Sequence, residues 1–115
     1  MTQDGDAGVP GSLGRVLAEV AAERVAQDVR FGMQVLPDGT GGEHAGAESE
    51  VARRSTDKAA DLGALTWRHV LEEEVLEAFA ESDPRRLRAE LIQVAAVAVK
   101  WTQALDRRPE SSTDA

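Results

Sequence analysis

A group of acidic side chains near the middle of the chain has the residue types and the spacing of a divalent-cation site. Three glutamates stand in a row from Glu72 to Glu74, and Glu77 follows one helical turn later. Farther along, Glu90 and Gln93 repeat a spacing of three residues. Residues three apart in a helix share a face, so each pair would present its oxygen atoms together. Carboxylate and amide oxygens are the ligands that Mg²⁺ prefers in proteins.

Helical phase divides this acidic row. At about 100° per residue, Glu74 and Glu77 fall on an apolar face of the predicted helix. Glu73 lies at the edge of that face, and Glu72 points elsewhere, toward solvent. Glu90 lies in the middle of the apolar stripe of the next predicted helix, with a polar residue at the stripe's edge one turn later. The row is therefore not one feature, because only part of it points inward.

A carboxylate inside an apolar stripe must be paired, protonated or bound to a cation. If the two helices are antiparallel neighbours, Glu74 and Glu77 face Glu90, and their like charges raise one another's pKa. A hard divalent cation removes that conflict. Periodicity alone does not decide between a metal site and a structural ion-pair cluster. The basic residues that could make such a cluster are Arg24, Arg86 and Lys100.

The first half of the chain is predicted to contain two helices. Ser12 is a suitable N-cap for a helix that runs to Phe31, and Gly32 stands where a helix-ending glycine belongs. Residues 33–48 are rich in glycine and contain a Pro-Asp-Gly turn signal, which predicts a loop. A second helix with a weak apolar pattern is expected over about residues 48–62.

Two further helices are predicted in the second half. Thr66 is the expected N-cap of a helix from Trp67 to about Glu81. A short connection then leads to Asp83 as a cap and Pro84 at the first position of a helix that runs to about residue 107. A connection this short predicts an antiparallel helix pair.

These elements predict an all-α protein with a four-helix bundle. Residues 1–11 and 109–115 are expected to be flexible tails that flank a single helical domain over residues 12–108. The third and fourth helices carry apolar residues on two opposite sides, which is typical of helices buried on both sides. In so small a chain the second side is expected to form a subunit interface in a homodimer or homotetramer.

Composition excludes several classes of function. The 115 residues include 21 acidic and 13 basic side chains, a formal charge of −8, which argues against binding to nucleic acids and to anionic membranes. The absence of cysteine excludes disulfides, thiolate zinc sites and a cysteine nucleophile. No signal-peptide pattern is visible, and no apolar run approaches the roughly 20 residues of a membrane span. A cytoplasmic protein is expected.

Several segments occur in an order that resembles one known family. They include E-E-V-L-E at 73–77 and E-L-I-Q at 90–93, preceded by E-R-V-A-Q-D-V-R-F-G-M-Q at 23–34, P-D-G-T at 37–40 and L-T-W-R-H-V-L-E-E-E at 65–74. The series is similar to the MazG-like all-α nucleoside triphosphate pyrophosphohydrolases, in particular a phage and actinobacterial MazG-like subgroup. The similarity covers about residues 20–108, and the ordered series is more specific than the acidic motif alone.

The resemblance implies a bundle in which acids hold Mg²⁺, or Mn²⁺, and the ion holds a nucleoside triphosphate that water cleaves to the monophosphate and pyrophosphate. Glu74, Glu77 and Glu90 match the family's metal ligands. Glu73 matches the first acid of the motif, and either Glu73 or Glu77 would orient or deprotonate the water. Gln93 stands where the family has aspartate. Its amide oxygen can coordinate Mg²⁺, but it brings no charge and cannot act as a base.

Other side chains are candidates for contacts with the substrate. Arg24 and Gln27 on the first helix would contact phosphate or base, and their alternative is an ion-pair or capping role. Trp67 and Trp101 would stack on the base, and their alternative is a place in the core. A solvated basic face is the simpler interpretation for three residues of the second helix, Arg53, Arg54 and Lys58.

The expected function is therefore Mg²⁺-dependent hydrolysis of an NTP or dNTP to the monophosphate and pyrophosphate. Gln93 and the weak pattern of the second helix favour an alternative. In that alternative the chain is a catalytically weak or inactive MazG-like module that binds a nucleotide or a protein partner.

Overall fold

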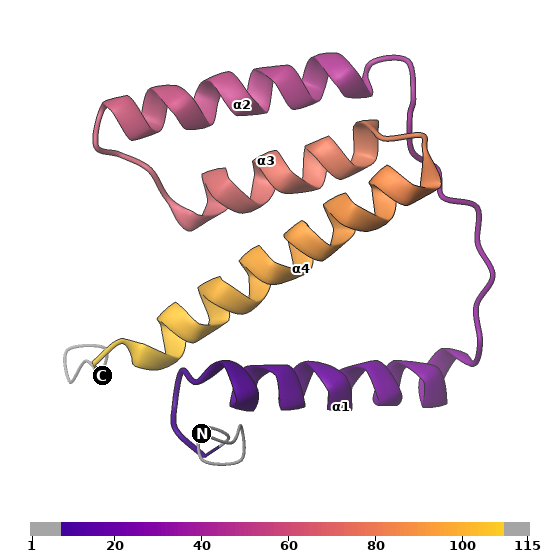
Figure 1. Ribbon diagram of the computed structural model, residues 1–115, viewed down its shortest axis with the longest axis vertical. Coiled ribbons are helices and arrows are strands. Elements are labelled where there is room, and N and C mark those ends of the chain that lie inside the picture. The colour runs from indigo at the N-terminus through magenta and orange to yellow at the C-terminus, as the bar shows by residue number, and fades with distance from the viewer. Residues whose placement is uncertain (1–7, 110–115) are drawn as a thin grey trace. The chain divides into compact units, whose positions relative to one another are not determined.

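The computed structural model describes residues 8–109, and within them every regular element is an α-helix. The predicted all-α fold class is confirmed. Of the predicted tails at residues 1–11 and 109–115, residues 1–7 and 110–115 lie outside the described residues. No helix in the described part of the chain is both long enough and apolar enough to span a membrane. Figure 1 labels the helices in chain order, α1 (Leu13–Phe31), α2 (Ala45–Asp61), α3 (Trp67–Ala80) and α4 (Pro84–Arg107).

The chain divides into two compact units. The central unit is Leu36–Ala98, which contains α2, α3 and the first part of α4. The terminal unit consists of the described residues before Leu36 and after Ala98, with α1 and the end of α4. The candidate metal ligands all belong to the central unit, so that unit carries the site.

The predicted caps of α1, α3 and α4 are present. Ser12 Oγ accepts a hydrogen bond from the backbone N–H of Arg15 at 3.2 Å, and Asp83 Oδ2 accepts one from Arg86 at 3.2 Å. Thr66 Oγ1 accepts from the N–H of His69, and the Thr66 N–H donates to His69 Nδ1 at 3.1 Å. These bonds satisfy backbone donors at the helix starts, which is why local sequence predicted the starts correctly.

The start of α2 differs from the prediction. The helix begins at Ala45, so the predicted loop over residues 33–48 was wrong at its C-terminal end. A tight turn brings the Ala45 N–H to Gly42 O at 3.1 Å, and the Glu48 N–H then bonds to His44 O at 3.0 Å. His44 makes no side-chain capping bond. Gly46 lies in the first turn of the helix, although glycine is more typical of loops. Packing against α3 therefore stabilises this turn, in place of any local signal.

Small side chains bring α2 and α3 together in the central unit. The buried residues of α2 are Ala52, Thr56 and Ala59, and these two helices lie side by side (Figure 1). Thr56 Oγ1 donates a hydrogen bond to the backbone carbonyl of His69 at 3.2 Å, which ties α2 to the first turns of α3. Because alanines allow close approach of two helices, the charged residues beside them are also brought near α3.

The chain reverses direction between α3 and α4 through residues 81–83 (Figure 1). The buried residue of α3 before this reversal is Ala78, and the buried residue of α4 after it is Leu87. Glu74 on α3 and Glu90 on α4 each lie about one turn farther from the connection. The reversal thereby places the acidic segments of two helices opposite each other.

The terminal unit is held by contacts between the start of α1 and the end of α4. Val16 is buried, and Gln103 Nε2 donates to the carbonyl of Gly11 at 3.0 Å. Gly11 has a φ of 79°, and a side chain at this position would collide with Arg107. Two large apolar residues of α1, Leu17 and Phe31, remain exposed.

Candidate metal centre

Helices α3 and α4 bring three carboxylates close together. Glu74, Glu77 and Glu90 each offer an oxygen atom, and these oxygens all lie within 4.8 Å of one another. All three residues are half-buried. Three of the four predicted metal ligands therefore converge, because an i, i+3 pair on α3 faces α4.

Two oxygens of this cluster have no hydrogen-bond partner. Glu74 Oε2 and Glu90 Oε2 are buried atoms, and nothing in the described residues donates to them. None of the ion pairs within residues 8–109 includes Glu74, Glu77 or Glu90. A buried oxygen without a donor is costly, so the expected alternative of a neutralised ion-pair cluster finds no support here.

The surroundings of the cluster disfavour negative charge. Burial raises the pKa of Glu74, and the charges of Glu90 and Glu73 raise it further. Burial likewise raises the pKa of Glu77, with additional contributions from Glu74, Glu90 and Glu73. Hydrogen bonding to Glu90 adds a smaller contribution at Glu77. The metal-free protein therefore holds these carboxylates in their charged form at a cost in stability.

These pKa shifts predict an unusual pH dependence of the stability of the metal-free protein. A carboxyl group whose pKa is raised by folding stabilises the fold below its unfolded pKa, near 4.5, and this contribution is lost as the pH rises through the raised value. Glu74→Gln removes the charge, so we expect the variant to have a higher Tm than the wild type at pH 8 in EDTA. The difference should shrink toward pH 4.

Thermal unfolding of the two proteins across this pH range measures the effect. Glu72→Gln is the matched control, because Glu72 is an exposed member of the same glutamate row and lies 3.9 Å from Arg68. The control should follow the wild type. Equal Tm values for wild type and Glu74→Gln at pH 8 would contradict the prediction.

The donor set fits a hard divalent cation. All three converging groups are carboxylates, and Mg²⁺ and Mn²⁺ prefer oxygen ligands. A cation among them would reduce the repulsion that raises the pKa of Glu74 and Glu77. The residues present therefore fit the cofactor that the sequence predicts.

Glu73 lies beside the converging group on α3, and the charges of two α2 residues act on it. Burial raises its pKa, the charge of Asp57 raises it further, and the charge of Arg53 lowers it. Both of these neighbours are on α2. Sequence reasoning treated Arg53 as part of a solvated face and did not consider Asp57. Their spacing of four residues, beside the small-residue stripe of α2, is the signal that indicates this arrangement.

The remaining predicted site residues are spread over the chain. Gln93 is exposed, one turn beyond Glu90. Trp67 is half-buried and belongs to the central unit. The other predicted substrate contacts, which are Arg24, Gln27 and Trp101, belong to the terminal unit.

Within the terminal unit, Arg24 is engaged locally. Its Nη2 donates to both carboxylate oxygens of Asp28, at 2.9 and 3.0 Å, and both side chains are more than half exposed. Arg24 and Gln27 also line a cavity of about 330 Å³ together with Val16 and Val20. The roles of these residues toward a substrate stay predictions.

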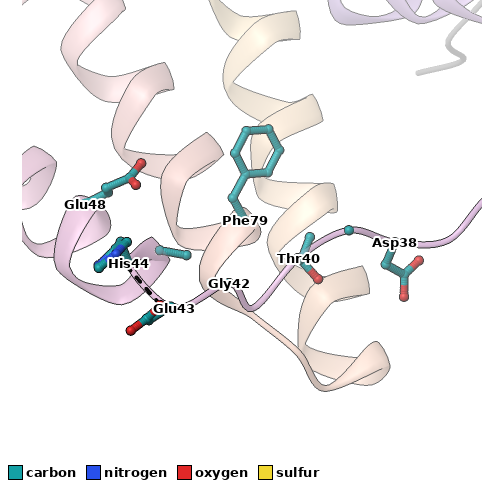
Figure 2. A pocket seen from close by; sticks show the side chains of 9 residues that line it. Asp38, Thr40, Gly42, Glu43, His44, Glu48 and Phe79 are labelled. Atoms are coloured by element: carbon teal, nitrogen blue, oxygen red, sulfur yellow. Dashed lines mark ion pairs between the residues drawn. The ribbon is translucent and has the colours of Figure 1, made fainter.

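A separate pocket of about 500 Å³ lies beside the start of α2 (Figure 2). The Gly41 N–H donates to the Phe79 carbonyl at 2.8 Å, which attaches the loop before α2 to the end of α3. The lining includes three acids and a histidine, namely Asp38, Glu43, Glu48 and His44. None of the clustered glutamates lines this pocket, and its acidic lining disfavours an anionic ligand.

Comparison with known protein families, with curated proteins and with solved structures finds no match for this chain.

Proposed function

We propose that this protein is a Mg²⁺-dependent nucleoside triphosphate pyrophosphohydrolase of the MazG-like type. The observation that carries the proposal is the convergence of Glu74, Glu77 and Glu90 with two buried oxygens that lack partners. The E-E-x-x-E motif on α3 and the acidic start of E-L-I-Q on α4 support the same assignment.

Each acid has a distinct task in this proposal. Glu74, Glu77 and Glu90 would hold Mg²⁺, or Mn²⁺. The bound cation would supply a positive charge for phosphate oxygens as the phosphoanhydride bond breaks. Glu73 lies outside the converging group and has a raised pKa, so it is suited to take a proton from the attacking water. Glu77 is the second candidate for that task.

A substrate panel tests the proposal directly. Each NTP and dNTP is incubated with the full chain, with and without Mg²⁺, and pyrophosphate release is measured. Release from at least one nucleotide, dependent on Mg²⁺, is the expected result. A panel without any pyrophosphate release would overturn the catalytic assignment.

Gln93 supports a second candidate function. Its side chain is exposed and brings no charge where the resembling family has aspartate. The second candidate is a catalytically weak or inactive module of the same fold that binds a nucleotide or a protein partner.

Gln93→Asp separates the two candidates. If the centre is competent but lacks one carboxylate, the added charge should increase hydrolysis by roughly 10-fold or more, the scale on which single metal-site groups affect activity. Pyrophosphate release by the variant and the wild type is compared at saturating Mg²⁺. Unchanged high activity in both proteins would mean that the wild-type ligand set is already complete.

The proposal includes a homodimer or homotetramer. Phe79, Leu91 and Ile92 are exposed large apolar residues on α3 and α4, in the part of the chain that also carries the metal centre. Exposed apolar side chains in number are typical of subunit interfaces. Light scattering should give at least twice the monomer mass of 12.3 kDa. A monomer mass at micromolar concentration would contradict this part of the proposal.

A further inference from the structure

The proposed site with its substrate carries more negative charge than one cation neutralises. Glu73, Glu74, Glu77 and Glu90 carry one negative charge each when ionised, and a nucleoside triphosphate adds several more. One or two divalent ions offset only part of this total. Sites that bind transferring phosphoryl groups commonly add an arginine or lysine to the metal. A basic side chain near the acidic face of α3 is therefore expected.

Arg53 occupies that place in the central unit. It lies directly after the buried Ala52 and three residues before the buried Thr56, so it flanks the stripe that packs on α3. Thr56 donates to the carbonyl of His69, one turn before Glu73. Arg54, in contrast, lies two positions after Ala52, farther around α2 from the buried stripe, and also approaches Glu50.

Electrostatic effects agree with this placement. Hydrogen bonding to Glu50 is the main cause of the raised pKa of Arg53, and the charges of Asp57 and Glu77 add to it. Arg53 in turn lowers the pKa of Glu73, against the larger effects of burial and Asp57. Arg53 is therefore linked to Glu73, whose pKa it lowers, and to Glu77, whose charge raises the pKa of Arg53.

Arg53 is held in place and still accessible. Its Nη2 donates to the two oxygens of Glu50, at 2.9 and 2.8 Å. Its side chain is 55% exposed. A guanidinium has five N–H donors, so the bonds to Glu50 leave donors for a ligand. Glu50 therefore fixes the direction of the arginine without using all of its binding capacity.

We propose that Arg53 contacts a phosphate oxygen of the substrate and that Glu50 positions it for this contact. The inference rests on the proposed function, because the anionic substrate is the ligand that makes the basic group necessary. It goes further by assigning a substrate-binding role to α2, the helix with the weakest sequence pattern. The ligand class is a polyphosphate chain presented with Mg²⁺.

Binding of inorganic tripolyphosphate tests the inference without requiring turnover. Calorimetric titrations in Mg²⁺ compare the full-length wild type with Arg53→Gln and Arg54→Gln. Loss of hydrogen bonds to a charged group is expected to weaken tripolyphosphate binding by roughly 10- to 100-fold in Arg53→Gln. Arg54→Gln is the matched control, since Arg54 is also basic, lies 3.6 Å from Glu50 and is 73% exposed. It should bind within about twofold of the wild type.

Arg53→Lys keeps the charge but lacks the planar fork, so it should lose only part of the affinity. This variant also carries the test if Arg53→Gln does not fold. Wild-type affinity in the folded Arg53 variants overturns the inference. Equal losses in the Arg53 and Arg54 variants overturn it as well, because they would indicate a general charge effect.

The outcome is separable from that of the proposed function. If the wild type releases pyrophosphate from a nucleotide but the Arg53 variants keep its KM and its tripolyphosphate affinity, only the role of Arg53 fails. If no nucleotide is hydrolysed, the catalytic assignment fails, and the tripolyphosphate titrations still decide the role of Arg53. A wild type that binds no tripolyphosphate in Mg²⁺ overturns the Arg53 contact in either case.

Discussion

Replacement of Glu74 or Glu90 by glutamine should reduce Mg²⁺-dependent pyrophosphate release by at least about 100-fold, since even residues that only support metal ligands cost up to that much. Each residue contributes an oxygen to the converging group, and each has a buried oxygen without a hydrogen-bond partner. Glutamine keeps the size of the side chain and removes its charge. The substitution would therefore remove a cation ligand and leave the packing almost unchanged.

Initial rates of pyrophosphate release, measured on the best nucleotide of the panel, give this comparison. Glu72→Gln again serves as the control, because it removes the same charge from the same row but from an exposed position. It should keep the wild-type rate. If Glu74→Gln and Glu90→Gln both keep it too, the centre is assigned to the wrong residues.

Mg²⁺ itself should stabilise the folded protein strongly. A ligand that binds only the folded state adds about 2.7 kcal/mol to the free energy of unfolding at 100 times its Kd. The stabilisation should be larger at pH 8 than at pH 5, because binding requires ionised carboxylates and the pKa values of Glu74 and Glu77 are raised. The Tm with and without Mg²⁺ at both pH values measures it.

The matched variants make this test specific. Glu90→Gln should lose most of the Mg²⁺ response, while Glu72→Gln should retain it. NaCl at equal ionic strength controls for general screening of the acidic surface. A Tm increase of the same size with NaCl, or an unchanged Mg²⁺ response in Glu90→Gln, would show that the three carboxylates do not form a specific site.

Local chemistry explains why most of the fold was predictable from the sequence. Ser12, Thr66 and Asp83 cap helices through bonds within three residues, so the sequence around each one contains the whole interaction. The inward position of Glu74 followed from helical phase in the same way. Gly32 ends α1 by donating to Asp28 O at 2.8 Å, again a local bond.

Features that depend on packing between α2 and α3 were not predictable. The start of α2 at Ala45 has no side-chain cap, and contact with α3 stabilises the helix. The same contact turns Arg53 and Asp57 toward Glu73, and no spacing within α3 contains that information. Periodicity assigns a residue to a face of its own helix, but the neighbour that covers the face is decided by the tertiary fold.

The hydrogen bond from Thr56 to His69 affects which substitutions the relatives of this chain can tolerate. Its acceptor is a main-chain carbonyl, which any residue at position 69 would supply. Substitution of the residue at position 69 therefore leaves this bond between α2 and α3 intact, provided that a hydroxyl remains at position 56. Relatives of this chain should vary freely at position 69 in this respect while serine or threonine persists at position 56. In an alignment of distant homologues, the hydroxyl residue at position 56 would then serve as a reference position for finding the acidic cluster, although it does not contact that cluster.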